Sequence, residues 1–287
     1  METTGLILEG GAMRSVFSAG VLDRLMEEGI QIPNVLAISA GAYAGMNYVS
    51  GQKGRIVDAV VGPLGEYKYM GLSTFLKKGT FFDMDYLFDV VPKTKAPYDF
   101  RKMKEYAGRF ITSTVNLLTG ENVYYESFRD EDEFFDICKV ANSMPLIAKV
   151  ARIDGIPMLD GGMADAVPIW KALEEGWNKL VIVLTQDASY RKKPQSALYM
   201  ATVKFIYRKY PKFLELIENR AQRYNAALDK VAELEAQGRA FVFRPSSITV
   251  KNSESDVDTL MNYYRHGYED AEQRMVELKR FLELSHQ

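Results

Sequence analysis

The sequence predicts an α/β protein with a mainly parallel central sheet. Residues 5–8 form an apolar, strand-like run, followed by a glycine-containing loop and then, over residues 16–26, by apolar residues at helical spacing. The pattern recurs at residues 35–38, which precede the small residues of 40–46. Two consecutive strand–helix units predict parallel pairing with a right-handed crossover. Residues 180–184 are continuously apolar, as in a strand buried on both faces, so we expect the parallel core to continue there.

The length and composition are those of a folded, water-soluble protein. A chain of 287 residues allows two small domains, or one large α/β domain with an appendage. Hydrophobic residues make up 47% and charged residues 26%, which argues against disorder, collagen-like repeats and a coiled coil. The formal net charge of −2, from 36 basic and 38 acidic residues, gives no whole-chain preference for nucleic acid.

Targeting and metal-binding signals are missing from the sequence. No apolar run approaches the roughly 18 residues of a membrane span, and the N-terminus does not read as a signal peptide, so we expect a cytoplasmic protein. Cys138 is the only cysteine, which excludes an intramolecular disulfide, and His266 and His286 are the only histidines. We therefore expect no metal site and no cofactor.

The other segments predict short helices, two hairpins and a helical C-terminal third. The acidic run at residues 130–133 lacks the spacing of a calcium loop and is interpreted as a solvated helix start. The expected elements are loops and short helices over residues 51–106, hairpin strands at 109–118 with 122–125 and at 150–153 with 157–159, a helix at 168–175, a strand at 241–243, and helices at 196–236, broken at Pro211, and at 256–284.

Ser39 lies directly between a predicted strand and a predicted helix, next to the small residues Ala40 and Gly41. This is the arrangement of the strand-to-helix elbow of serine hydrolases, where the helix N-terminus favours developing negative charge. Ala37 replaces the first glycine of the Gly-x-Ser-x-Gly pattern. The structural alternative is a serine that only caps the helix.

The loop after the first strand contains Gly10, Gly11 and Ala12, followed by Arg14. Glycines let backbone N–H groups point into one cavity, which is how an oxyanion hole is built. A dinucleotide or phosphate loop is disfavoured because its glycine spacing is absent, and a plain tight turn is the other alternative. Since the carboxyl ends of parallel strands meet at one edge of a sheet, we expect this loop to neighbour Ser39.

A base for Ser39 is offered by Asp160, which ends a short predicted strand and is followed by Gly161 and Gly162. A serine nucleophile needs a base within hydrogen-bond reach. His266 falls in a polar helical stretch and His286 is the penultimate residue, so both are poor candidates. A Ser39–Asp160 dyad is therefore preferred to a Ser39–Asp160–His266 triad. The alternative for Asp160 is a structural turn.

Taken together, these motifs resemble the patatin-like phospholipase family of the bacterial type. The glycine loop, the serine elbow and the Asp-Gly-Gly motif occur in the family's order, and residues 141–145 resemble its Ser/Pro-containing stretch. The resemblance implies a three-layer α/β/α fold and hydrolysis of lipid acyl esters by a Ser–Asp dyad, without a metal, through an acyl-serine. It predicts a catalytic α/β domain over residues 1–190 and a mainly helical part, 191–287, packed on it.

Three positions depart from the family pattern. Ala12 and Ser15 replace the third and last glycines of the loop, and Ala166 stands where asparagine is common. If Ala12 needs a positive φ, the strain costs about 1 kcal/mol. Arg14 is expected to order the loop, or otherwise to meet a carboxylate or phosphate. The functional alternatives to a lipid hydrolase are a lipid-binding or regulatory protein with a weakened site, and a short-chain carboxylesterase or thioesterase.

Residues 190–230 carry ten Lys or Arg against three Asp or Glu, interleaved with aromatic residues. This composition fits a helix pair resting on anionic lipid, or helices that pack their aromatics inward and solvate a basic face. We expect a lipid or other acyl ester as substrate, possible peripheral membrane contact, and no nucleic acid. Four methionines are candidates for an acyl pocket or for plain core: Met13, Met46, Met70 and Met84.

Overall fold

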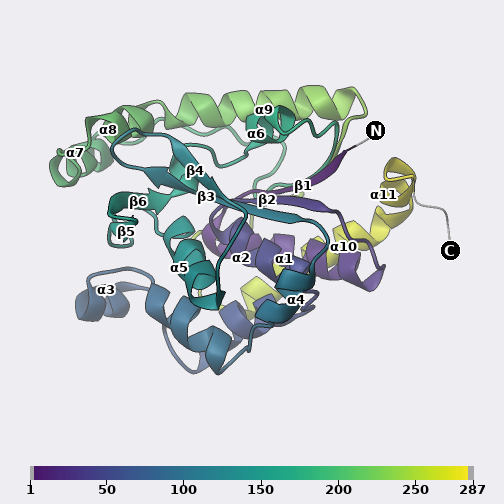
Figure 1. The fold of residues 1–287 in the computed structure, drawn as a ribbon, viewed down its shortest axis with the longest axis horizontal. Coiled ribbons are helices and arrows are strands. Elements are labelled where there is room, and N and C mark those ends of the chain that lie inside the picture. Colours follow the sequence, from purple (N-terminus) through teal and green to yellow (C-terminus); the bar gives the residue numbers. More distant parts are fainter. Residues whose placement is uncertain (1–2, 284–287) are drawn as a thin grey trace.

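The central sheet has eight strands in the order β5–β6–β3–β2–β1–β7–β8, with β4 paired to β3. The computed structural model describes residues 3–283 (Figure 1). Neighbours in the run β3–β2–β1–β7–β8 are parallel, whereas β4, β5 and β6 join antiparallel. The parallel core and both hairpins are thus confirmed. The strands are β1 (Thr4–Leu8), β2 (Asn34–Ala37), β3 (Arg109–Asn116), β4 (Asn122–Tyr125), β5 (Ala151–Ile153), β6 (Ile156–Asp160), β7 (Lys179–Val183) and β8 (Ala240–Phe243).

Helices cover both faces of the sheet, so the three expected layers are present (Figure 1). Helices α1, α2, α5 and α10 lie on one face, and α6 and α9 on the other. The helices are α1 (Ser15–Glu27), α2 (Ala40–Val49), α3 (Leu72–Lys78), α4 (Phe100–Glu105), α5 (Glu131–Ala141), α6 (Ile169–Glu174), α7 (Ala197–Ile206), α8 (Pro211–Glu218), α9 (Arg220–Ala236), α10 (Val257–Gln273) and α11 (Met275–Phe281).

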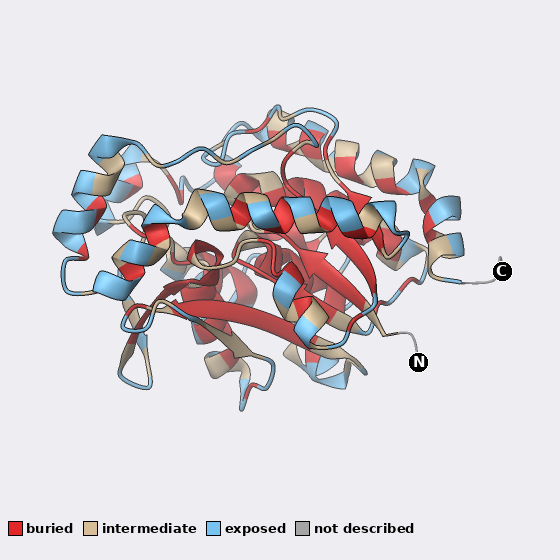
Figure 2. Cartoon of the chain, turned by 90° about the horizontal axis from the view of Figure 1, so that it is seen from above, coloured by how far each residue is buried: buried red, intermediate tan, exposed pale blue. Residues whose placement is uncertain are grey.

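The sheet is buried on both sides because successive side chains of a strand point to opposite faces. Leu6 and Leu8 of β1 pack in the core that includes α1 and α2, while Ile7 packs in the core that includes α6 and α9. Helix α9, seen from above in Figure 2, alternates between buried and exposed residues along its length. It is an amphipathic helix that shields one face of the sheet.

The C-terminal part contributes to the same sheet and layers. Strand β8 extends the sheet by pairing with β7, and α10 packs along α1. The two helices approach closely at two glycines, since a Cβ at Gly20 or Gly267 would lie 2.1 Å from a backbone oxygen of the opposite helix. These contacts show that the C-terminal part packs on the α/β part of the chain, and the division at residue 190 stays a prediction.

The predicted C-terminal helices contain additional breaks. Besides the break at Pro211, a second one at Asn219 separates α8 from α9. The Asn219 side chain donates to the carbonyl oxygen of Glu215 at 3.1 Å, and such local bonds compete with the helical ladder. The helix predicted over 256–284 is divided at Arg274, and its last position lies outside the described residues. Among residues 3–283, none of the helices has the length and apolarity needed to cross a bilayer.

Candidate active site

Ser39 occupies a tight turn between β2 and α2. Its φ of 55° and ψ of −132° are rare for a residue with a side chain. The neighbours must be small, because a Cβ at Gly41 would lie 2.6 Å from the carbonyl oxygen of Leu8. Ala37 fits at the first motif position because its Cβ faces Gly45, where a second Cβ would be 3.1 Å away. This strained strand-to-helix turn has the geometry of a nucleophile elbow.

The Ser39 hydroxyl and the Asp160 carboxylate are hydrogen-bonded. Oγ of Ser39 donates to Oδ2 of Asp160 at 2.5 Å, although the residues are 121 positions apart in the sequence. Oδ1 of Asp160 accepts the N–H of Gly162 at 2.8 Å, and the N–H of Asp160 donates to the carbonyl of Ser143 at 2.9 Å. Both members of the pair are buried. The structure therefore brings together the two residues that the sequence proposed as nucleophile and base.

The glycine loop lies against this pair. A Cβ at Gly10 would be 2.6 Å from the Cβ of Ser39, so a side chain there would displace the serine. Among residues 3–283, the N–H groups of Gly10, Gly11 and Ala12 donate to no protein acceptor, whereas the next N–H, of Met13, donates to a carbonyl. Three unused donors thus lie in the loop that contacts the serine, as an oxyanion hole requires.

The expected strain at Ala12 is present, since its φ is 49°. Gly11 also excludes a side chain, because a Cβ there would lie 2.6 Å from Oγ1 of Thr185. Arg14 donates from Nε to the carbonyl oxygen of Val250 at 3.1 Å, a contact that orders the loop. Gly161 admits no side chain either, since its Cβ would clash with Ser113.

Comparison with known proteins identifies the family of the chain. The family model described as patatin-like phospholipase matches residues 6–173. The chain belongs to this family. Residues 210–283 match a second model, described only as a domain of unknown function (DUF6363).

This patatin-like chain is similar to a curated protein and to a solved structure. The uncharacterized protein YjjU of Escherichia coli (strain K12) is 25% identical over an alignment of 203 residues, and the match covers 66% of this chain and 54% of YjjU. The chain thus spans about half the length of that relative. The crystal structure of VipD from Legionella pneumophila has a TM-score of 0.48 and 13% identity, with 95% of this chain and 66% of that chain covered.

Burial sets the protonation behaviour of Asp160 in the patatin-like site. It raises the pKa of the carboxyl group to about 6, against the opposing effects of the hydrogen bonds from Ser39 and Gly162 and of the Arg220 charge. Above this pH the carboxylate is the main form and can accept a proton. A base whose pKa lies close to the operating pH is largely ionised and still binds a proton strongly enough to take it from a hydroxyl group.

His266 lies apart from the dyad. Its ring packs edge-on against Phe17, with the centroids 5.3 Å apart, and its Nε2 atom is 3.1 Å from Oγ of Ser246. In the described part of the chain it is hydrogen-bonded to neither Ser39 nor Asp160. The alternative triad therefore has no support in the geometry, and His286 lies outside the described residues. Within 3–283, no three His, Cys, Asp or Glu residues are arranged to hold a metal ion.

Glu9, directly before the glycine loop, is a site residue that the sequence analysis missed. Its carboxylate accepts bonds from the N–H and the hydroxyl of Thr185, at 2.6 and 3.0 Å, and from the Tyr224 hydroxyl. Burial raises the pKa of Glu9. The contacts tie the start of the loop to the end of β7 and to α9. An acidic residue between an apolar strand and a glycine loop was the signal that could have revealed it.

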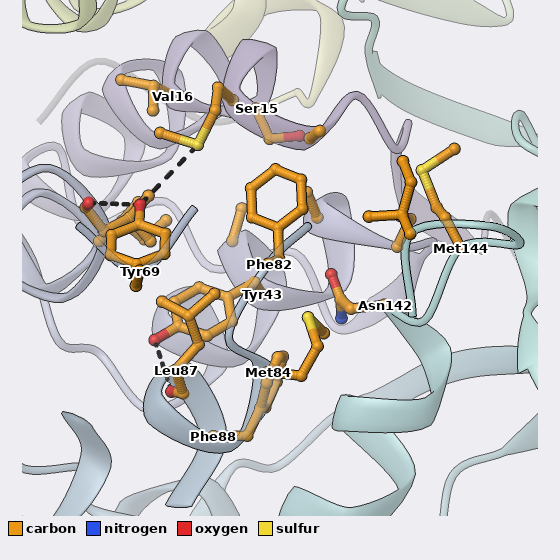
Figure 3. A pocket seen from close by; sticks show the side chains of 18 residues that line it. Ser15, Val16, Tyr43, Tyr69, Phe82, Met84, Leu87, Phe88, Asn142 and Met144 are labelled. Carbon is orange, nitrogen blue, oxygen red and sulfur yellow. Dashed lines mark hydrogen bonds between the residues drawn. The ribbon is translucent and has the colours of Figure 1, made fainter. Parts of the chain in front are cut away.

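Two cavities meet at Ser39. The first, here called the apolar cavity, is lined mainly by side chains such as Tyr43, Phe82, Leu87 and Met144 (Figure 3). The second, the polar cavity, is lined by Asp160 and the glycine loop. Ser39, Ala12 and Met144 line both. Of the four methionines considered for an acyl pocket or for core, Met13 and Met84 line the apolar cavity, whereas Met46 and Met70 belong to the core only.

Proposed function

We propose that this patatin-like protein is a serine lipid acyl hydrolase of the phospholipase A or lysophospholipase type, with Ser39 as nucleophile and Asp160 as base. The observation that carries the proposal is the 2.5 Å hydrogen bond from Ser39 Oγ to Asp160 Oδ2 at the end of an apolar cavity. Such a cavity can accept an acyl chain and leave its ester carbonyl at the serine.

In this mechanism Oγ of Ser39 attacks the ester carbonyl while Asp160 accepts the hydroxyl proton. The N–H groups of Gly10, Gly11 and Ala12 stabilise the oxyanion of the tetrahedral intermediate. The proton moves from Asp160 to the departing alcohol, which leaves acyl-Ser39. A water molecule then gives a proton to Asp160 and attacks the acyl group, and protonation of Ser39 Oγ releases the fatty acid and restores the dyad.

The apolar cavity also distinguishes the proposed activity from that of a short-chain esterase. Aromatic and aliphatic side chains line it from Ser39 toward Leu87 and Phe88, and each buried CH₂ of a substrate adds about 0.8 kcal/mol. A hydrolase of lipid acyl chains should therefore favour longer chains over acetyl esters. The lipid-binding alternative rests on Ala12, Ser15 and Ala37, of which Ala12 is strained but keeps its N–H.

Labelling with a fluorophosphonate probe tests the proposed function. We expect the purified protein to gain the mass of one phosphonyl group at Ser39, because the probe reports an activated serine, and Ser39→Ala to gain none. The variant should remain folded by circular dichroism. If the folded wild type is not labelled and hydrolyses no acyl ester, the chain is better explained as a lipid-binding protein.

Peripheral membrane contact is a further part of the proposal. Within the basic segment, Tyr207, Phe213 and Tyr224 are buried, whereas Leu198, Phe205 and Ile206 of α7 are exposed. Further exposed apolar residues lie on α3, and α3 and α7 border one groove. This end face, seen at the left of Figure 1, consists of Leu72, Phe75, Leu76, Val150, Leu198, Phe205 and Ile206.

Basic side chains complete the end face. Four of them form no ion pair with a carboxylate among residues 3–283, and they are Lys77, Lys149, Arg208 and Lys209. Apolar side chains flanked by cations are the usual combination of a surface that binds anionic lipid. The loop from Met144 to Val150 joins this face to the apolar cavity, since Met144 and Ile147 line the cavity while Leu146 and Val150 line the groove.

Leu198→Glu is expected to weaken binding to vesicles that contain phosphatidylserine. The Leu198 side chain is 80% exposed, and loss of its burial in lipid costs about 2 kcal/mol, or roughly thirtyfold in the partition coefficient. Vesicle sedimentation measures this change. Val276→Glu is the matched control, because Val276 is 53% exposed on α11 at the opposite end of the molecule (Figure 1). Equal binding of both variants would contradict the assignment of the end face.

A further inference from the structure

We propose that the polar cavity, through Arg14, Lys192 and Arg220, binds the phosphate group of a glycerophospholipid substrate. The inference rests on the proposed function and adds to it the recognition of the alcohol part of the ester. The polar cavity adjoins the apolar cavity at Ser39, Ala12 and Met144.

The position of the polar cavity relative to the nucleophile supports this role. Its lining includes Ser39, Asp160 and the glycine loop, and it shares Ser39 and Ala12 with the apolar cavity. An ester bound with its acyl chain in the apolar cavity places its carbonyl at Ser39, so its alcohol part extends into the polar cavity. In a glycerophospholipid the phosphate is attached to that alcohol part, only a few bonds from the ester.

Three cationic side chains converge on the polar cavity from separate parts of the chain. Arg14 follows the glycine loop, Lys192 lies after β7, and Arg220 begins α9. None of the three forms an ion pair with a carboxylate within residues 3–283. Arg14 and Arg220 donate from Nε to the carbonyl oxygens of Val250 and Gly162, at 3.1 and 3.3 Å. Their other guanidinium donors are left to meet an anion.

Lys192 is the side chain that most clearly lacks a counterion. Its Nζ lies 4.3 Å from the ring centroid of Tyr224, and it is largely withdrawn from water. Burial, together with the charges of Arg220 and Arg14, lowers the pKa of Lys192 to about 8, with Glu9 opposing the shift. A bound phosphate would supply the missing counterion and raise the pKa of Lys192 again.

The two carboxylates of the cavity do not neutralise the cations through direct contact. Glu9 is already bonded to Thr185 and to the Tyr224 hydroxyl, and Asp160 is bonded to Ser39 and to the N–H of Gly162. Three cations against two acids leave an excess of one positive charge. Guanidinium and ammonium groups that converge in this way are the usual partners of phosphate oxygens.

Lys192→Met and Lys193→Met form a matched pair of variants for the test. Each removes one lysine charge, but Lys193 is exposed and does not line the polar cavity. The substrates are a 1-acylglycerol 3-phosphate and a monoacylglycerol with the same acyl chain, in identical detergent micelles at pH 7. We expect wild type and Lys193→Met to prefer the phosphate-bearing substrate. Lys192→Met should reduce the ratio of the two kcat/KM values roughly tenfold or more.

A binding measurement separates this inference from the proposed function. Titration calorimetry with Ser39→Ala should detect binding of sn-glycerol 3-phosphate but not of glycerol. The double variant that carries Lys192→Met as well should bind sn-glycerol 3-phosphate roughly tenfold more weakly. If Ser39→Ala binds sn-glycerol 3-phosphate but the wild type hydrolyses no acyl ester, the proposed function is refuted and the inference about the polar cavity stands. Equal substrate ratios in the two lysine variants, or no binding of glycerol 3-phosphate, would overturn the inference. Binding of inorganic phosphate without a substrate preference would assign the cavity to a free anion and overturn it as well.

Discussion

Asp160→Asn is expected to lower the rate of ester hydrolysis at least about 10⁴-fold while the protein stays folded. Asparagine has the same shape and can still accept the N–H of Gly162 at Oδ1, but it cannot take the proton from Ser39. Loss of one member of a nucleophile–base pair typically removes most of the catalysis. Initial rates with a p-nitrophenyl acyl ester measure the effect, and Ser39→Ala should show a loss of similar size.

The stability of the variant provides the control. In the folded protein the Asp160 pKa is raised from 3.8 to about 6, so ionisation of this buried group destabilises the fold as the pH rises through that interval. Asparagine carries no such charge, so thermal unfolding at pH 8 should occur no earlier than in the wild type. A folded Asp160→Asn protein that keeps a tenth of the wild-type rate would exclude Asp160 as the base.

The wild-type rate should follow the ionisation of the same carboxyl group. Because the base must be ionised, kcat/KM is expected to fall about tenfold per pH unit below pH 6 and to level off above it. Any hydrolytic activity that remains in Asp160→Asn should not show this fall of kcat/KM below pH 6.

The main features of the site could be predicted because they depend on local sequence order. A glycine loop and a serine elbow that follow adjacent parallel strands meet at one sheet edge, whatever the rest of the chain does. The scarcity of histidine left Asp160 as the best-placed base. The dyad partners are 121 positions apart, yet their placement followed from the order of the motifs.

The cationic lining of the polar cavity could not be predicted in the same way. Arg220 lines the same cavity as Ser39 because α9 packs on the face of the sheet, and no local pattern encodes that packing. Composition likewise identified a basic, aromatic segment without showing which side chains point inward. Phe213 and Phe205 have the same chemistry and similar neighbours, but the first is fully buried and the second is 73% exposed.

Gly267→Ala is the second change with a large expected effect, this time on stability. The new Cβ on α10 would lie 2.1 Å from the carbonyl oxygen of Phe17 on α1, so two rigid helix backbones would have to separate. Overpacking of this kind costs about 3 kcal/mol, which corresponds to a fall in the melting temperature on the order of 5 °C. Gly65→Ala is the matched control, because a Cβ at Gly65 has nothing within 4 Å.

The way in which Gly267→Ala unfolds also tests whether residues 191–287 and the preceding α/β part form one cooperative unit. Gly267 lies far from Ser39 in the sequence, but β8 and α10 share the sheet and the core with β1 and α1. Helical circular dichroism and ester hydrolysis should therefore be lost together at the lowered temperature. If the helical signal falls first while hydrolysis persists, residues 191–287 form a separable module, and the close approach of α10 to α1 does not stabilise the dyad.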